Sequence, residues 1–233
     1  MSYNCYMNKL KSLLKSPALA LGLAPLLFAL SQIIILGYQW LIKDRAGDLT
    51  LTVSRYVGLE LWTSILFAIF NFVIIVIMFR YYLSLWKSRS LLWLILGIFQ
   101  VIGFAILSLS PQNVFLDEPY LTITSHIHDV GSHMMFIAMF AMAFETLRLC
   151  YPNHLKFLQR FWLFKCPEKV SFPSVTPKIS VFFIIYGLFY LFVYTTRWDV
   201  VWSRVLILET GYIYAFMAFL ILTRKITPSD KIA

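Results

Sequence analysis

Apolar residues recur along this chain of 233 residues in long runs, separated by short polar stretches. Each run has about 20 residues, enough for a helix to cross a hydrocarbon layer about 30 Å thick. A backbone in contact with lipid must satisfy its own hydrogen bonds, so we expect each run to be helical. The pattern predicts an all-α, polytopic bundle of six transmembrane helices, with spans at 17–42, 57–79, 91–110, 127–149, 179–198 and 203–223.

The composition supports a single integral membrane domain over residues 1–233. Hydrophobic residues make up 60% of the chain and charged residues 13%, whereas soluble domains average about 45–50% and about 25%. The net charge of +9 comes from residues in short loops between the apolar runs. We therefore expect membrane lipid as a partner and no nucleic acid.

Lysine and arginine predict the orientation of the bundle. Fifteen of the twenty lie on one side of the predicted spans and five lie on the other. The positive-inside rule places the richer side, with both termini, in the cytoplasm. We expect a multi-pass protein of the plasma (inner) membrane, with the basic amphipathic loop 150–178 along its cytoplasmic surface.

A cluster of polar residues opens the fourth predicted span. At about 100° per residue, His126, Asp129 and His133 form one stripe of a helix, while His128 points away from it. Charged groups inside a membrane are costly and by default mark a functional site. We therefore predict that the stripe faces the interior of the bundle near its outer side.

Other predicted spans carry complementary residues at similar depth. Glu60 and Ser64 share a face of the second span, Glu209 lies in the sixth, and Tyr190 and Tyr194 follow one another at i, i+4 in the fifth. The predicted outward-opening pocket comprises Glu60, Ser64, His126, Asp129, His133, Tyr190, Tyr194 and Glu209.

Two structural interpretations remain beside this pocket. Polar groups in spans often form hydrogen bonds between helices without further function, and Gln100 is expected to bond a neighbouring helix. Glu145 and Arg148 are expected to form an ion pair at the inner interface.

Three functional classes fit these residues. The first is a protein that binds or organises lipid or another amphiphile. The second is a zinc-dependent membrane hydrolase acting on a lipid, with His126, Asp129 and His133 as candidate metal ligands and Glu60 or Glu209 as the general base. The third is a structural subunit that contacts other membrane proteins. The sequence contains no glycine-flanked nucleophilic serine and no glycine-rich phosphate-binding loop, so no catalytic residue is assigned.

Two segments carry a family resemblance. The stretch 107–111 (Leu-Ser-Leu-Ser-Pro), an acidic loop, and then 128–136 (His-Asp-Val-Gly-Ser-His-Met-Met-Phe) resemble the opening of a late helix in the DRAM/Frag/Sfk six-helix membrane proteins, the damage-regulated autophagy modulator family, and in related uncharacterised prokaryotic families. This resemblance implies a role in membrane-lipid organisation or trafficking, without an established catalytic activity. The chain also resembles the seven-helix ceramidase-like superfamily, whose Ser, Asp and three His hold zinc, but here three histidines share one helix.

Overall fold

The computed structural model describes residues 16–43, 53–85, 91–110, 123–151, 173–196 and 205–223. All regular structure in these ranges is helical, which confirms the predicted all-α class. Five of the described helices are long and apolar enough to cross a membrane, and a shorter apolar helix accompanies them. The protein is therefore an integral, multi-pass membrane protein.

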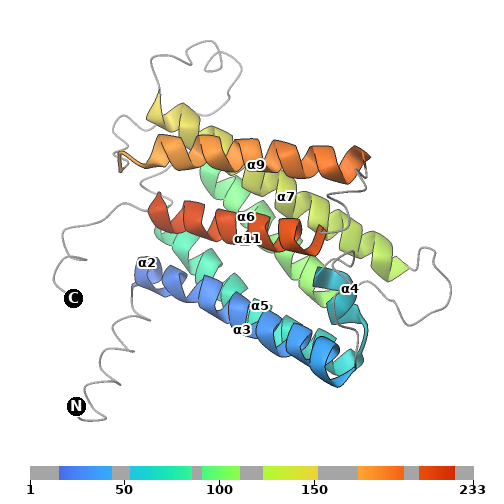
Figure 1. The fold of residues 1–233 in the computed structure, drawn as a ribbon. Coiled ribbons are helices and arrows are strands. Elements are labelled where there is room, and N and C mark those ends of the chain that lie inside the picture. The colour runs from blue at the N-terminus through green and yellow to red at the C-terminus, as the bar shows by residue number, and fades with distance from the viewer. Residues whose placement is uncertain are drawn as a thin grey trace, which may run out of the picture.

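The helices run back and forth through one bundle (Figure 1). The chain enters through a continuous helical segment, which consists of α2 (Pro17–Ala20), η1 (Leu21–Leu23), α3 (Ala24–Gly37) and the π-helical turn η2 (Tyr38–Ile42). The helices that follow are α4 (Val53–Gly58), α5 (Leu61–Ser84), α6 (Leu91–Leu109), α7 (Ile123–Cys150), α9 (Thr176–Thr196) and α11 (Val205–Leu222). The beginning of α2 and the end of α11 lie at the same end of the bundle, and α4 lies at the other, called here the α4 end.

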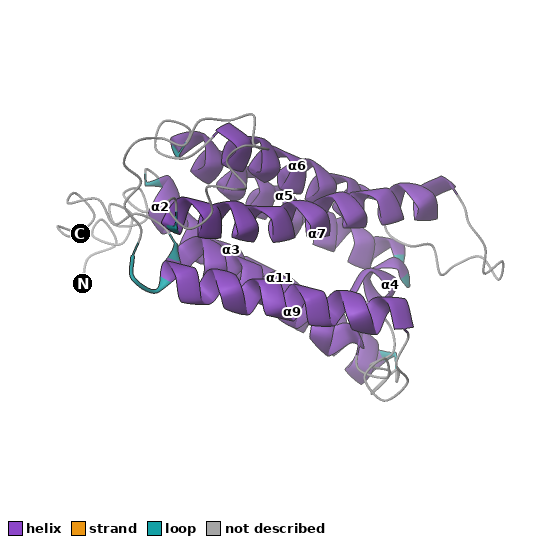
Figure 2. Cartoon of the chain, turned by 90° about the horizontal axis from the view of Figure 1, so that it is seen from above, coloured by secondary structure: helices purple, strands orange, loops and turns teal. Residues whose placement is uncertain are grey.

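The helix bounds differ from the predicted spans mainly at the α4 end. The predicted second span began at residue 57, whereas α4 ends at Gly58 and α5 begins at Leu61. Glu60 is the extended N-cap residue of α5 and so lies outside the membrane-spanning helix. Helix α7 begins at Ile123, before the predicted residue 127, and its first turns reach beyond the neighbouring helix ends (Figures 1 and 2). Polar residues can continue a helix past the apolar run that hydropathy detects.

Two glycines allow close contact between α6 and α7. A Cβ atom added to Gly103 would lie 2.6 Å from the Met135 nitrogen and 2.7 Å from the Gly131 carbonyl oxygen. A Cβ atom added to Gly131 would lie 2.9 Å from the Gly103 oxygen. Small residues let helix backbones approach closely in membranes, where packing rather than hydrophobicity drives association. This contact determines which face of α7 is buried.

Buried polar side chains connect the helices. The Tyr82 hydroxyl on α5 donates to Gln100 Oε1 on α6 at 3.1 Å, which confirms the expectation that Gln100 bonds a neighbouring helix. Trp93 Nε1 on α6 donates to Thr146 Oγ1 on α7 at 3.1 Å. Each bond satisfies a polar group that would otherwise be costly inside the bundle.

An ion pair lies near the C-terminal end of α7. Arg148 Nε and Nη2 donate to the two carboxylate oxygens of Glu145, each at 2.7 Å. Both side chains are buried, and their bidentate geometry is the strong form of this interaction. The predicted pairing is confirmed.

Candidate functional site

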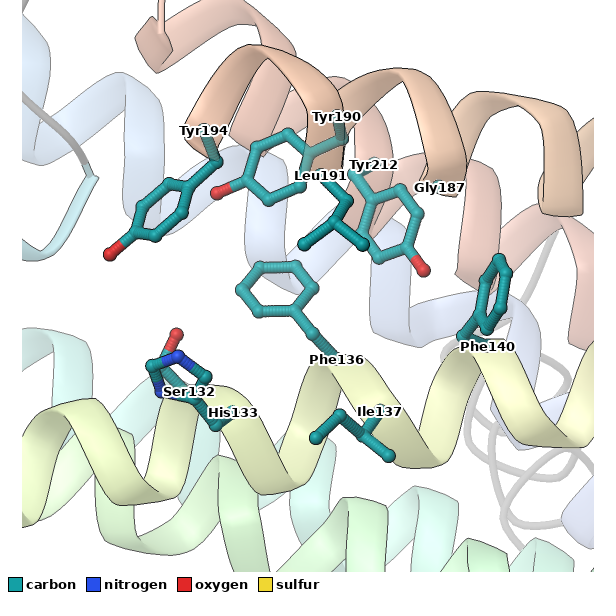
Figure 3. A pocket seen from close by; sticks show the side chains of 10 residues that line it. All are labelled: Ser132, His133, Phe136, Ile137, Phe140, Gly187, Tyr190, Leu191, Tyr194 and Tyr212. Atoms are coloured by element: carbon teal, nitrogen blue, oxygen red, sulfur yellow. The ribbon is translucent and has the colours of Figure 1, made fainter. Parts of the chain in front are cut away.

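A pocket opens on the side of the bundle between α7 and α9, and α11 forms its back wall (Figure 3). We call it the α7–α9 pocket. Its volume is about 180 Å³. It is lined by Ser132, His133, Phe136, Ile137 and Phe140 of α7, by Gly187, Tyr190, Leu191 and Tyr194 of α9, and by Tyr212 of α11.

Aromatic rings form the wall of this pocket. Phe136 stacks on Tyr190 with ring centroids 5.3 Å apart. Tyr190 in turn stacks on Tyr212 at 5.5 Å with an interplanar angle of 15°, and on Tyr194 at 6.2 Å. Three helices, α7, α9 and α11, thus meet through rings that stack on one another. The result is a rigid apolar surface rather than a set of separate side chains.

Gly187 keeps one end of the pocket open. A Cβ atom added there would lie 2.9 Å from Phe140 Cδ2 and 3.0 Å from the Tyr212 hydroxyl oxygen. A larger residue would therefore press on the aromatic wall and occupy part of the space.

Polar groups gather at the other end of the pocket, nearer the α4 end. Figure 3 shows the hydroxyl groups of Tyr190 and Tyr194 on the same side as Ser132 and His133, opposite Phe140. His133 Nδ1 lies 2.6 Å from the backbone carbonyl oxygen of Asp129, one turn earlier, and this contact orients the imidazole ring. Most polar groups of the lining therefore lie at this end, and the Tyr212 hydroxyl lies at the other, near Gly187 and Phe140.

Several lining residues lie on the outer surface of the bundle. Ile137 is 65% exposed, Leu191 is 55% exposed and Tyr194 is 44% exposed. Side chains on the flank of a membrane-spanning helix meet lipid rather than water. The pocket is therefore accessible sideways from the bilayer.

The prediction that the histidine stripe faces the bundle interior is wrong. His126 and His133 are exposed, whereas His128 is buried and its Nδ1 lies 2.6 Å from the carbonyl oxygen of Ser110. Gly131 must face α6 to permit the close backbone contact, and His128, three residues earlier, lies on the same face. The stripe consequently lies on the outside of the bundle.

Glu60 does not join the histidines. Its Oε2 atom accepts hydrogen bonds from the Tyr38 hydroxyl at 2.9 Å and from Trp62 Nε1 at 2.8 Å, and its Oε1 atom lies 3.2 Å from Lys43 Nζ. Partial burial raises the pKa of this carboxyl, but the bonds from Tyr38, Trp62 and Lys43 together outweigh it and hold the pKa below its ordinary value. The same Glu60 contact raises the pKa of Lys43. These residues connect η2 to the beginning of α5 at the α4 end of the bundle.

Ser64 and Glu209 stabilise α4 and do not line the pocket. Ser64 Oγ donates to the Val57 carbonyl oxygen at 3.0 Å, which closes the turn between α4 and α5. Glu209 is buried on α11, where Oε2 accepts a hydrogen bond from the Val53 backbone N–H at 3.2 Å. The predicted set therefore divides: the pocket contains His133, Tyr190 and Tyr194, and the remaining residues lie elsewhere.

The zinc ligand set predicted on α7 is not formed. Within the described ranges, no three His, Cys, Asp or Glu side chains come close enough together to hold a metal ion. His126 and His133 are two turns apart on one exposed helix face, and no second helix brings a ligand to them in that part of the chain.

Sequence reasoning missed the residues that shape the pocket. Phe136 and Tyr212 are ordinary aromatic residues of apolar spans, and nothing in their spacing indicates that they stack across helices. Gly187 offered a signal, because a glycine one residue after Tyr186 and three before Tyr190 leaves a gap beside large rings.

Comparison of the chain with protein-family models, with curated proteins and with solved structures gives no match.

Proposed function

We propose that this protein binds a membrane amphiphile in the α7–α9 pocket, with an acyl chain against the aromatic wall and the polar group near His133 and Tyr194. One observation carries the proposal: the pocket is open to lipid along its flank, and most of its polar groups, those of Ser132, His133, Tyr190 and Tyr194, gather at one end. An amphiphile in the bilayer has the same polarity pattern along its length.

The size of the pocket limits what it holds. Its volume of about 180 Å³ is below the roughly 300–1,000 Å³ of pockets that enclose a drug-sized ligand. The space accommodates a segment of one chain, so the rest of the ligand remains in the bilayer. Binding therefore does not require the ligand to leave the membrane.

Because the ligand enters from the bilayer and not from water, its selective binding cannot depend on the hydrophobic effect. A chain that moves from lipid to an apolar pocket gains little from the hydrophobic effect, because both environments are apolar. Selectivity must come from packing against rigid rings and from hydrogen bonds at the polar end. The stacked Phe136, Tyr190 and Tyr212 supply the first, and Ser132 and Tyr194 offer the second.

The resemblance to the damage-regulated autophagy modulator family supports the same class of function, because that family is associated with membrane-lipid organisation. Of the residues at its motif positions, Ser132 and Phe136 line the pocket. The lining of the pocket and the family resemblance thus point to the same region of α7.

The proposal is tested by filling the pocket from its lipid-facing side. Leu191 lines the pocket and is 55% exposed, so Leu191→Trp adds volume there without changing the core. Leu188 lies on the same helix, is 51% exposed and does not line the pocket, so Leu188→Trp is the matched control. Native mass spectrometry in mixed micelles measures bound oleoyl lysophosphatidylglycerol.

We expect Leu191→Trp to reduce the bound fraction at least about fivefold, which corresponds to about 1 kcal/mol. Leu188→Trp should bind as the parent protein does. Equal binding by the parent and both variants would contradict the proposal, since the pocket would then not be the place where the ligand is held.

A further inference from the structure

A second hollow lies on the neighbouring face of α7, against α6. Its walls include Phe99 of α6 and Val130, Met134 and Ala138 of α7. We call it the α6–α7 hollow. Its lining is almost wholly apolar, and Phe99 and Val130 are 50% and 57% exposed. Like the α7–α9 pocket, it is accessible from the bilayer.

Both hollows share two residues of α7. His133 and Ile137 line the α7–α9 pocket and also the α6–α7 hollow. The two spaces therefore lie at the same depth in the membrane, with a ridge of side chains between them. Ile137, which is 65% exposed, is the prominent apolar residue of that ridge.

The histidine stripe continues the same ridge toward the α4 end. At about 100° per residue, His126, His133 and Ile137 lie within about 40° of one another around the helix axis. His126 belongs to the turns of α7 that extend beyond the neighbouring helices (Figures 1 and 2). Polar groups thus lie directly beyond the point where the two apolar hollows meet.

We propose that one two-chain phospholipid straddles α7, with one chain in each hollow and its phosphate over His133. This inference rests on the proposed function and names the class of its ligand. An α-helix with its side chains is about 10–12 Å wide. The two acyl chains of one lipid can therefore pass on either side of the Ile137 ridge without separating by more than about this width. An amphiphile with a single acyl chain can fill only one of the two hollows.

The polar end of the ridge suits a phosphate group. Imidazole N–H and hydroxyl groups donate hydrogen bonds, and phosphate oxygens accept them. Ser132 and Tyr194 offer such donors beside the shared ridge. His133 Nδ1 donates to the Asp129 carbonyl oxygen, so the ring offers a phosphate an Nε2–H donor when it is protonated, and His126 lies further out along the ridge. Apart from His133, the residues that line the two hollows are apolar or carry only a hydroxyl group, and among those hydroxyls only that of Tyr212 lies at the other end.

The test compares two probes that share a headgroup. The full chain in mixed micelles is offered dioleoyl phosphatidylglycerol or oleoyl lysophosphatidylglycerol at equal mole fraction, and binding is measured by native mass spectrometry. We expect the two-chain probe to be preferred at least about tenfold. Val130→Trp fills the α6–α7 hollow and should lower two-chain binding to the level of the lysolipid while lysolipid binding stays unchanged. Ile127→Trp, on an exposed position of α7 outside both hollows, is the control.

Three results would overturn the inference. If the parent binds both probes equally, or if Val130→Trp leaves two-chain binding unchanged, the second hollow takes no chain. If dioleoylglycerol, which lacks the phosphate, binds as tightly as the phospholipid, the polar end of the ridge does not recognise phosphate. Failure of the proposed function is a separate outcome, because Leu191→Trp would then affect neither probe. Melting temperatures equal to those of the Ile127→Trp control exclude misfolding as the cause.

Discussion

Alanine at Gly103 should separate α6 from α7. The added Cβ atom would lie 2.6 Å from the Met135 nitrogen and 2.7 Å from the Gly131 oxygen, and both are backbone atoms that no rotamer change can move. Overpacking of this kind costs about 1–3 kcal/mol. We expect the upper half of that range, because two helix backbones must shift together.

Gly37→Ala provides the matched control. Gly37 is also helical, and an added Cβ atom there meets nothing within 4 Å. Both substitutions gain the same helix propensity of about 1 kcal/mol, so the difference between the two variants isolates the steric clash. SDS titration in mixed micelles, followed by circular dichroism, measures the free energy of unfolding. If Gly103→Ala is as stable as Gly37→Ala, the close contact that sets the face of α7 does not exist.

Two further predictions concern charged pairs. Glu145→Leu removes the carboxylate that binds the buried Arg148, and we expect the free energy of unfolding in the same SDS titration to fall by about 3–5 kcal/mol. The double variant Glu145→Leu with Arg148→Met should lose less stability than the single variant. An equal loss in both variants would contradict the pairing. Glu60 has a lowered pKa in the folded protein, so its contribution to stability is present above its ordinary pKa of 4.5 and is lost as the pH falls through the folded value. Melting temperatures on either side of pH 4.5 should therefore decline on acidification in the parent and in Lys43→Arg, but less in Glu60→Gln; equal declines would show that Glu60 is not coupled to folding.

The helical architecture could be predicted because membrane thickness imposes a length on each apolar run. The predicted spans coincide with the observed helices to within a few residues, except where polar residues continue or interrupt a helix. The predicted span 57–79 contains Glu60, whereas the helix is interrupted between Gly58 and Leu61. Hydropathy measures composition and does not detect such a break.

The orientation of α7 could not be predicted by the rule that charged stripes face inward. In a membrane both faces of a helix are apolar, so the buried face is chosen by close packing rather than by hydrophobicity. Gly131 packs closely against α6, and the face of α7 that is thereby buried contains His128 and not the predicted stripe. His128 tolerates burial because the Ser110 carbonyl oxygen meets its ring, a contact that depends on how α6 ends.

The tyrosines of α9 were easier to identify. Tyr190 and Tyr194 are one turn apart, and that spacing places them on one face in any helix. Their partners Phe136 and Tyr212 lie on two other helices, α7 and α11, and a single sequence does not show which residues of different helices pack together. The residues of one helix face were therefore predictable, but the pocket between helices was not.

The central claim, an acyl chain between α7 and α9, is tested most directly by photo-crosslinking in lipid nanodiscs. A phosphatidylglycerol with a diazirine midway along one chain is activated by light, and the labelled residues are identified by peptide mass spectrometry. We predict that adducts concentrate on Leu191 and Ile137, which line the pocket, and that excess unlabelled lipid reduces them. Leu188 is exposed to a similar extent but lies outside the pocket. Equal labelling of Leu188 and Leu191, unaffected by competitor, would show that lipid only surrounds the helices and would contradict the account.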